Sequence, residues 1–257
     1  MVLYLNAQSI VNKINELGCI TSDLEPDLVL VTETWCNSEV SNAYLDIPGY
    51  ELLPDLRMDK CNTDRGRGGG LLVYAKRGLQ VLSCDSGADF VQHCKFVTRG
   101  VTFYLIYRSP NSPVAELTKL AKLIRHAEKN CVIIGDFNLP QIDWPAGMAR
   151  GAGVVVMDAV EEALMTQMVE FSTQVRGNIL DLVINNMPER IQEVREEGRL
   201  GKSDHVMIVT EISVGKQVSE NQLPLPDWRR ADWMAMKQEL ADRSWSRRVM
   251  ASGTDAA

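Results

Sequence analysis

The chain has 257 residues, of which 45% are hydrophobic and 24% are charged, a composition typical of a globular protein with one sizeable α/β domain or two small ones. Its net charge of −7 argues against binding of nucleic acid by the whole surface, although it leaves room for a local basic face. The six cysteines form no CxxC pair, which argues against a zinc site or a dense disulfide framework and predicts reduced thiols in an intracellular protein without a membrane span.

The first part of the chain predicts two buried strands separated by a helix. Residues 2–5 form an apolar run that ends at Asn6, and residues 28–32 form a second run that ends at Glu33. Apolar residues at near-helical spacing lie between the two runs: Ile10, Ile14, Leu17 and Ile20. Each predicted strand therefore delivers a polar side chain at its end.

Residues 34–68 show no periodic pattern and predict long loops with short elements, followed by a strand at 71–75. The segment 57–77 is rich in basic side chains: Arg57, Lys60, Arg65, Arg67, Lys76 and Arg77. One interpretation is a solvated charged loop. The other is a surface that binds DNA phosphates, in which Arg65 and Arg67 are the expected contacts because glycines beside them allow close approach of the backbone.

The second half alternates strands and helices. We expect a strand at 101–107, a helix that begins near Ser112 and Pro113, a strand at 132–135 that ends at Asp136, a loop at 140–155, a helix at 157–171, a strand at 179–184 that carries Asp181, and a last strand at 206–212. The last strand directly follows Asp204 and His205. Beyond residue 214 the composition changes, and Pro224 and Pro226 indicate a linker, so we expect one domain at 1–214 and a linker or tail at 215–257.

Polar side chains thus follow several predicted strands at the point where each strand ends. Taken singly, each is a weak signal, because a glutamate after a strand is usually solvated, Asp and Asn favour turns, and a lone histidine is more often structural. Strands that share a sheet can bring such ends to one edge, where α/β proteins often build their sites.

Together, these residues resemble the motifs of the endonuclease/exonuclease/phosphatase superfamily, in the order of that family. The motifs are Leu5-Asn6, Val31-Thr32-Glu33-Thr34, Tyr107-Arg108-Ser109-Pro110-Asn111, Gly135-Asp136-Phe137-Asn138, Ile179-Leu180-Asp181-Leu182 and Ser203-Asp204-His205. The resemblance covers about residues 2–213. It implies an α/β fold, a two-layer core of packed mixed sheets flanked by helices in a four-layered α/β/β/α sandwich.

Within the superfamily, the short sequence motifs around Tyr107, Asp136 and Asp181 are similar to those of the endonuclease domain of non-LTR (LINE-type) retrotransposon polyproteins. Residues 229–233 resemble the linker toward the reverse transcriptase. The resemblance implies a Mg²⁺-dependent endonuclease that nicks DNA and leaves 3′-hydroxyl and 5′-phosphate ends, as in target-primed retrotransposition. Its expected partners are DNA and a reverse transcriptase domain of the parent polyprotein, in the nucleus and without a membrane.

The resemblance also implies a role for each site residue. Glu33 is the main metal ligand, Asn6 lies nearby and Asp204 binds a second ion or a metal-bound water, with Mg²⁺ as the expected ion and Mn²⁺ as a substitute. Asp136 activates the attacking water and Asn138 orients it. His205 stabilises the transition state and is oriented by Asp181, while Tyr107 and Asn111 hold the phosphate.

One departure and two alternatives stay open. Gln8 replaces the acidic residue that superfamily nucleases often carry two positions after the first Asn, which predicts weaker metal binding. The same motifs suit a phosphatase or phosphodiesterase of this fold that acts on a small phosphorylated substrate. A fragment of a transposon could also be an inactive module that binds DNA or protein.

Overall fold

The computed structural model describes residues 1–60, 68–88, 91–213, 234 and 237–238. The chain divides into two compact units, Met1–Val214 and Gly215–Ala257. All the strands and helices named below belong to the first unit, and the assignment of 1–214 as the endonuclease domain stays a prediction. The tail expected at 215–257 lies almost entirely outside the described residues.

One six-stranded sheet has the strand order β13-β14-β1-β2-β4-β3. Its strands are β1 (Val2–Asn6), β2 (Leu28–Thr32), β3 (Tyr50–Leu52), β4 (Leu71–Lys76), β13 (Ile191–Glu196) and β14 (Ile208–Ile212). β1 and β2 run parallel and the other neighbours are antiparallel. Short 3₁₀ turns at Asn42–Leu45, Pro54–Leu56 and Pro188–Arg190 lie in its connections.

A second six-stranded sheet has the order β11-β12-β8-β7-β6-β5. Its strands are β5 (Ser83–Gly87), β6 (Gln92–Thr98), β7 (Val101–Tyr107), β8 (Cys131–Asp136), β11 (Thr166–Gln167) and β12 (Asp181–Asn185). β7 and β8 are its parallel pair. A separate small hairpin joins β9 (Ile142–Asp143) to β10 (Met148–Ala149).

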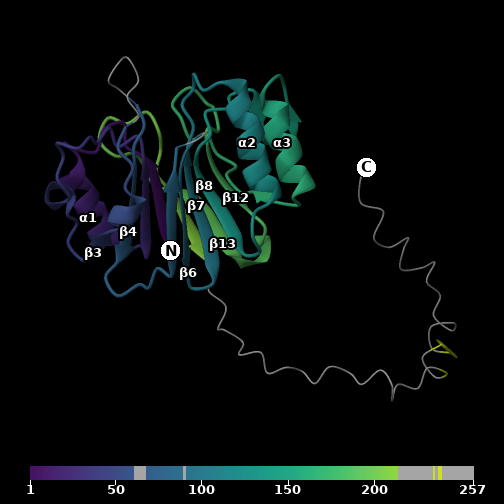
Figure 1. Cartoon of the computed structure of the whole chain (residues 1–257), viewed down its shortest axis with the longest axis horizontal. Coiled ribbons are helices and arrows are strands. Elements are labelled where there is room, and N and C mark those ends of the chain that lie inside the picture. Colours follow the sequence, from purple (N-terminus) through teal and green to yellow (C-terminus); the bar gives the residue numbers. More distant parts are fainter. Residues whose placement is uncertain (61–67, 89–90, 214–233, 235–236, 239–257) are drawn as a thin grey trace. The chain divides into compact units, whose positions relative to one another are not determined.

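Three α-helices complete the domain: α1 (Ile14–Leu24), α2 (Val114–Arg125) and α3 (Gly153–Glu162). Figure 1 shows α1 outside the first sheet and both α2 and α3 outside the second, with the two sheets between them. The largest core cluster fills the space between the sheets, with Tyr4 and Leu30 from one sheet and Phe103 and Val132 from the other. The predicted four-layered sandwich of two mixed sheets is therefore confirmed.

The register of the second sheet places three polar side chains in a row. Tyr107 pairs with Asp136 across β7 and β8, and Asp136 pairs with Asp181 across β8 and β12. In the first sheet, Asn6 pairs with Thr32, so Glu33 follows directly beside Asn6. The strand ends thus bring residues that are far apart in sequence to the same edge of the sandwich.

The helix predicted at 157–171 is wrong in its second half and begins too late. α3 spans Gly153–Glu162, after which Leu164 adopts a left-handed conformation with φ of 52° and lies 87% exposed. The chain then forms β11, whose Thr166 and Gln167 pair with the edge of β12. Backbone hydrogen bonds to this sheet edge replace the helical ones, which the apolar pattern alone does not reveal.

Several strands have no counterpart in the sequence prediction: β5, β6 and β13 were not predicted, β3, β9 and β10 lie in expected loops, and β11 lies in the expected helix. β6 alternates buried and half-buried residues, but Gln92 and Thr98 occupy buried positions, which weakens the hydrophobic signal of the strand. The expected helix start near Ser112 is correct in place, although Pro113 is the N-cap residue and no side-chain capping bond forms among the described residues.

Gly135 in β8 has no room for a side chain, and Gly135→Ala should destabilise the domain by about 3 kcal/mol or more. A Cβ atom at this position would lie 1.9 Å from the carbonyl oxygen of Ile106 in the neighbouring strand. Gly18→Ala in α1 is the matched control, because no heavy atom lies within 4 Å of its added Cβ. That change should stabilise the domain by up to about 1 kcal/mol. Urea unfolding of both variants measures the two effects, and equal stabilities would contradict the packing argument.

Candidate active site

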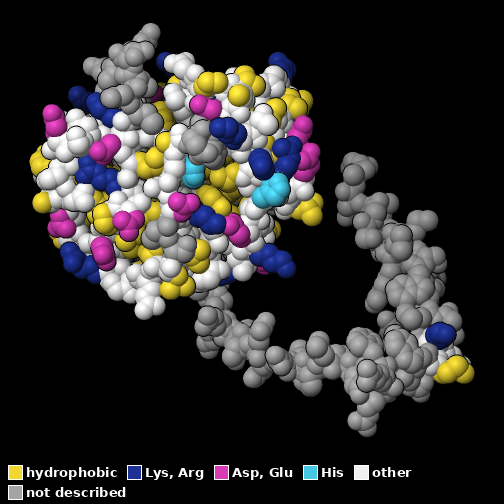
Figure 2. All heavy atoms as spheres, viewed as in Figure 1, with side chains coloured by type: hydrophobic (Ala, Val, Ile, Leu, Met, Phe, Trp, Pro, Cys, Tyr) yellow, Lys and Arg dark blue, Asp and Glu magenta, His cyan; other side chains and the backbone are white. Residues whose placement is uncertain are grey.

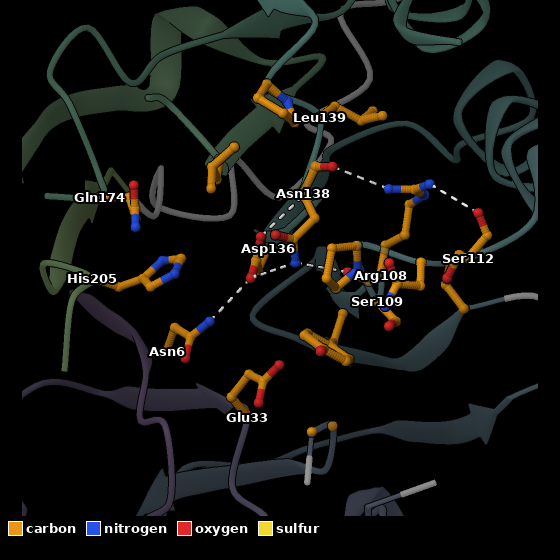
Figure 3. A pocket seen from close by; sticks show the side chains of 18 of the residues that line it. Asn6, Glu33, Arg108, Ser109, Ser112, Asp136, Asn138, Leu139, Gln174 and His205 are labelled. Atoms are coloured by element: carbon orange, nitrogen blue, oxygen red, sulfur yellow. Dashed lines mark hydrogen bonds between the residues drawn. The ribbon is translucent and has the colours of Figure 1, made fainter. Parts of the chain in front are cut away.

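A cleft of about 760 Å³ opens at the edge where the polar strand ends meet. Eight of the predicted site residues line it: Asn6, Glu33, Tyr107, Asn111, Asp136, Asn138, Asp204 and His205. Asp181 lies below the cleft, fully buried, where it contacts His205. Figure 3 shows His205, Asp136, Asn6 and Glu33 around the same opening. The structure therefore brings these nine side chains together.

Glu33 stands at one side of the cleft, directly after β2. Its backbone is left-handed with φ of 53°, an uncommon conformation for a residue other than glycine. The indole Nε1 of Trp35 donates a hydrogen bond to this carboxylate. Burial raises the pKa of Tyr107, and the charge of Glu33 raises it further, so the Tyr107 hydroxyl keeps its proton beside Glu33.

Asp136 is the last residue of β8 and its carboxylate is almost completely buried. It accepts hydrogen bonds from the Asn6 side-chain amide at 3.0 Å, from the Asn138 backbone N–H at 3.0 Å and from the Asn138 side-chain amide at 2.9 Å. Burial raises its pKa well above the usual range, and the nearby charge of Asp181 adds to the effect. A carboxylate with a raised pKa accepts a proton more readily near neutral pH.

Arg108 fixes the loop that carries Asn138, a role that the sequence analysis missed although Arg108 lies within a recognised motif. Its buried guanidinium donates to the carbonyl oxygens of Asn138 at 3.1 Å and Ser112 at 3.2 Å. In return, the Asn138 side-chain amide donates to the Arg108 carbonyl oxygen at 2.8 Å. This reciprocal contact orients Asn138 toward Asp136.

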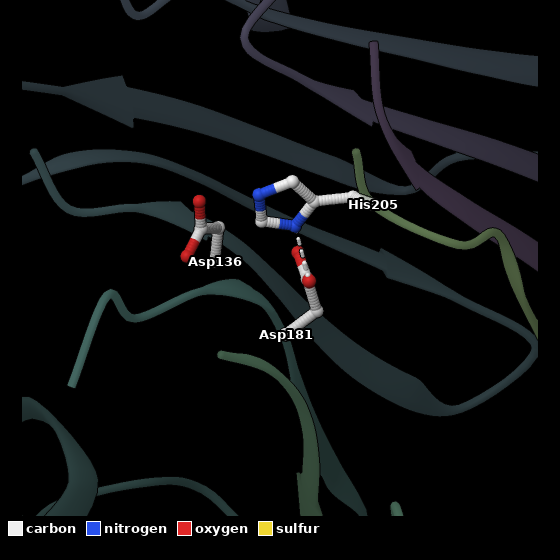
Figure 4. A group of neighbouring side chains, drawn as sticks. All are labelled: Asp136, Asp181 and His205. Carbon is white, nitrogen blue, oxygen red and sulfur yellow. Dashed lines mark hydrogen bonds and ion pairs between the residues drawn. The ribbon is translucent and has the colours of Figure 1, made fainter. Parts of the chain in front are cut away.

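His205 and Asp181 form a hydrogen-bonded pair between the two sheets. The Nδ1 atom of His205 lies 2.6 Å from Asp181 Oδ2, as Figure 4 shows. Burial lowers the pKa of His205, but the charge of Asp181 and its hydrogen bond outweigh this and raise the pKa to about 9. The imidazole is therefore a cation at neutral pH, with Nε2 left to donate a hydrogen bond.

Asp204 is held by two glutamines. Gln174 Nε2 donates to Asp204 Oδ2 at 2.8 Å, and the Gln8 side chain donates to Oδ1 while it accepts from the Asp204 backbone N–H at 3.1 Å. His205 Nε2 lies 3.6 Å from Asp204 Oδ1. Gln8 thus orients the Asp204 carboxylate, a role that its position in the sequence did not indicate. No sequence signal identified Gln174.

The donor atoms of the cleft fit a divalent cation. Ligand atoms of Asp136, Asp181 and His205 lie within 4.8 Å of one another, which is one geometry able to hold a metal ion. However, both Asp181 oxygens already accept hydrogen bonds, from Tyr4 and from His205. Among the described residues that line the cleft, carboxylates outnumber guanidinium groups. The carboxylates belong to Glu33, Glu116, Asp136 and Asp204, and the guanidinium groups to Arg108 and Arg176. An excess of hard, negatively charged oxygens suits Mg²⁺ or a similar ion.

Comparison with known proteins finds one similar sequence family and several solved structures with a similar fold. The family model described as "Endonuclease-reverse transcriptase" matches residues 101–209. The endonuclease domain of TRAS1, a telomere-specific non-LTR retrotransposon, aligns with a TM-score of 0.61 over 84% of this chain and 98% of its own, at 18% identity. Residues 101–209 are therefore similar in sequence to an endonuclease family, and the chain shares the fold of these nucleases.

Two further solved structures align over nearly the whole of their own chains. The 3′-5′ exonuclease NExo from Neisseria meningitidis has a TM-score of 0.63 at 16% identity and covers 82% of this chain and 99% of its own. An AP endonuclease from Archaeoglobus fulgidus has a TM-score of 0.63 at 15% identity, with coverage of 82% and 98%. Among curated protein sequences, no match was found.

The solved structures that share this fold include nucleases and a 3′ phosphatase. The similarity to these structures shows the fold, and the geometry of the cleft supports the roles proposed below for individual residues. None of the helices in the described part of the chain is long and apolar enough to cross a membrane.

The predicted DNA contacts Arg65 and Arg67 lie outside the described residues. Gly68 and Gly69, which follow them, line the cleft. Figure 2 shows basic and acidic side chains interspersed over the visible face of the described domain. This mixture agrees with the net charge of −7 and favours contact with a polyanion at a local site over binding by the whole surface.

Proposed function

We propose that the chain is a Mg²⁺-dependent DNA endonuclease that nicks one strand and leaves 3′-hydroxyl and 5′-phosphate ends. The observation that carries the proposal is the arrangement of His205, Asp136 and Glu33 around one open cleft. A hydrogen-bond donor, a proton acceptor and a hard metal ligand are the three parts that hydrolysis of a phosphodiester requires.

In this proposal, Asp136 accepts the proton of the attacking water, helped by its raised pKa. Asn138 and Asn6 keep the carboxylate in place through their amide groups. The water oxygen forms a bond to phosphorus while the bond from phosphorus to the 3′ oxygen breaks. The 3′ oxygen takes up a proton from solvent, and the phosphate stays on the 5′ end.

His205 stabilises the charge that develops on the phosphoryl oxygens. Its Nδ1 is held by Asp181, so the imidazolium presents Nε2 as a charge-assisted donor toward the cleft. Tyr107 and Asn111, which line the same cleft, would hold the phosphate through a hydroxyl and an amide.

The metal site is assigned to Glu33 and Asn6, with Asp204 as the ligand for a second ion or a metal-bound water. Glu33 offers a carboxylate and Asn6 an amide oxygen, both hard donors. A bound Mg²⁺ would supply neutralisation of the phosphate charge and of the developing leaving oxygen. Mn²⁺ has the same preference for oxygen ligands and should substitute for it.

DNA is the proposed substrate, and a reverse transcriptase domain of a parent polyprotein is the proposed partner, with action in the nucleus. The family model that matches the chain is described as an endonuclease–reverse transcriptase, which supports both proposals. Arg65 and Arg67 stay predicted contacts to DNA phosphates, since Gly68 and Gly69 beside them line the cleft. A 3′-hydroxyl end is the primer that a reverse transcriptase needs.

The test is nicking of supercoiled plasmid by the full chain with Mg²⁺, with excess EDTA and with a His205→Gln control. We expect open-circular DNA with Mg²⁺ only and little product from the control. A DNA polymerase should extend the nick directly, which requires a 3′-hydroxyl, and a ligase should reseal it, which requires a 5′-phosphate.

Two results would overturn the proposal in favour of the alternatives. Release of inorganic phosphate from small phosphorylated compounds, without nicking of plasmid, would assign a phosphatase of the same fold. Retention of plasmid in a binding assay, with no cleavage above the EDTA control, would assign an inactive module that binds DNA.

A further inference from the structure

We propose that Tyr4 is a positioning residue for His205 and that it acts through Asp181. The inference deepens the proposed endonuclease function and rests on it. Tyr4 lies in β1, where the sequence analysis treated it as part of an apolar run. Its ring belongs to the core between the two sheets, but its hydroxyl reaches the functional pair.

The hydrogen bonds around Tyr4 have a definite direction. The Tyr4 hydroxyl donates to Asp181 Oδ1 at 2.6 Å, and the hydroxyl oxygens of Tyr4 and Thr32 lie 3.0 Å apart. A phenol has one hydrogen, and that hydrogen is used on Asp181, so Thr32 must donate to Tyr4. The result is a buried chain in which Thr32 donates to Tyr4, and both Tyr4 and His205 donate to Asp181.

These hydrogen bonds connect the two sheets. Tyr4 belongs to β1 of the first sheet, Asp181 to β12 of the second sheet, and His205 lies in the segment just before β14 of the first sheet. Thr173 Oγ1 accepts the backbone N–H of Asp181 at 3.1 Å, which fixes the main chain at this point. Two hydrogen bonds then restrain rotation of the Asp181 carboxylate, one from Tyr4 to Oδ1 and one from His205 to Oδ2.

The consequence concerns the orientation of the imidazole. Without Tyr4, the carboxylate would be anchored only by His205 and could rotate with it, so Nε2 would point less consistently into the cleft. Loss of a group that orients a catalytic side chain, with no contact to the substrate, commonly costs about 10- to 100-fold in activity. Tyr4 is therefore expected to affect the chemical step more than substrate binding.

Tyr4→Phe removes only the hydroxyl, and Tyr74→Phe is its matched control. Tyr74 is also fully buried and donates one hydrogen bond, to the Leu45 carbonyl oxygen at 3.0 Å, on the other face of the first sheet. Single-turnover nicking of plasmid with Mg²⁺ should slow by about 10-fold or more in Tyr4→Phe, with DNA affinity within about twofold of wild type. Tyr74→Phe should change neither the rate nor the affinity by more than about twofold.

A double-mutant cycle tests whether Tyr4 acts through Asp181. In an Asp181→Asn background, Tyr4→Phe should have little further effect, because residues that act as one unit are non-additive. Multiplying losses would show an independent role for Tyr4 and would overturn the inference. A wild-type rate in Tyr4→Phe would overturn it as well.

Histidine NMR provides a readout that is independent of activity. The chain has three histidines, and the His205 imidazole signals are identified by their absence in His205→Gln. In ¹⁵N-histidine-labelled protein, Tyr4→Phe should shift the Nδ1 signals of His205 and leave those of His93 and His126 unchanged, whereas Tyr74→Phe should shift none of them. Unchanged His205 signals in Tyr4→Phe would overturn the inference. If the wild type itself fails to nick DNA, the proposed function falls and the NMR result alone decides the inference.

Discussion

Replacement of His205 by alanine should lower the single-turnover rate of DNA nicking by about 10²- to 10³-fold, the loss expected when one donor to a transition-state oxyanion is removed. Asp181→Asn should cost less, because the imidazole would remain in the cleft without its charged partner at 2.6 Å. The double mutant should be little slower than His205→Ala alone, since the two residues act as one unit.

The measurement compares wild type, both single mutants and the double mutant on one plasmid preparation at saturating enzyme. Losses that multiply in the double mutant would contradict the paired role. His126→Ala is a suitable control, because His126 lies exposed at the end of α2, where its ring contacts a backbone carbonyl of the same helix. It should cut at the wild-type rate.

The same pair should make stability depend on pH. The pKa of His205 rises from 6.5 to about 9 on folding, because the charge of Asp181 outweighs the effect of burial. The stabilisation is therefore fully present below about pH 6.5 and is lost as the pH rises through 9. In EDTA, the difference in unfolding free energy between wild type and His205→Gln should shrink across this range. A difference that stays constant from pH 6 to 10 would contradict the raised pKa.

Glu33→Gln should abolish most nicking at low millimolar Mg²⁺, with partial recovery at high Mg²⁺ or with Mn²⁺. The substitution keeps the shape of the side chain and removes the charge that a hard cation requires. The experiment is a titration of each metal against the single-turnover rate, which should show a weaker apparent affinity for the ion together with a lower maximal rate.

Glu116→Gln is the matched control for Glu33→Gln. Glu116 lines the same cleft, half-buried on the first turn of α2, and it is not assigned to the metal. Its substitution should change the rate by no more than about twofold. Full activity of Glu33→Gln, or of the wild type in excess EDTA, would show that the metal assignment is wrong.

The sequence by itself determined the strands that carry the site. Continuous apolar runs at β2 and β8 can be satisfied only in the interior of a sheet, so their ends at Glu33 and Asp136 could be located without coordinates. Short motifs in a fixed order then indicated the superfamily and its fold. Their residue types, carboxylates, amides and one histidine, indicated phosphoryl chemistry.

Only the tertiary structure decided which side chains support those residues. In the sequence, Tyr4 is indistinguishable from the other apolar residues of its strand. The hydrogen-bond partner of its hydroxyl, Asp181, is 177 positions away and lies in the other sheet. Gln174 gave no signal, since its contact with Asp204 depends on how a loop packs. Hydrogen bonds between sheets follow from the packing of two layers, and a one-dimensional pattern of hydrophobicity holds no information about which polar atoms that packing brings within 3 Å.

The extent of helix α3 was also decided by tertiary structure. The apolar residues after Glu162 have a composition suitable for a helix, yet the chain turns at Leu164 and Thr166 pairs with the edge of β12. An exposed sheet edge offers backbone hydrogen bonds that compete with helical ones, and its position is set by strands elsewhere in the chain. Local preference therefore determined the central elements of this protein, while contacts between distant segments determined its sheet edges and the side chains that support the candidate active site.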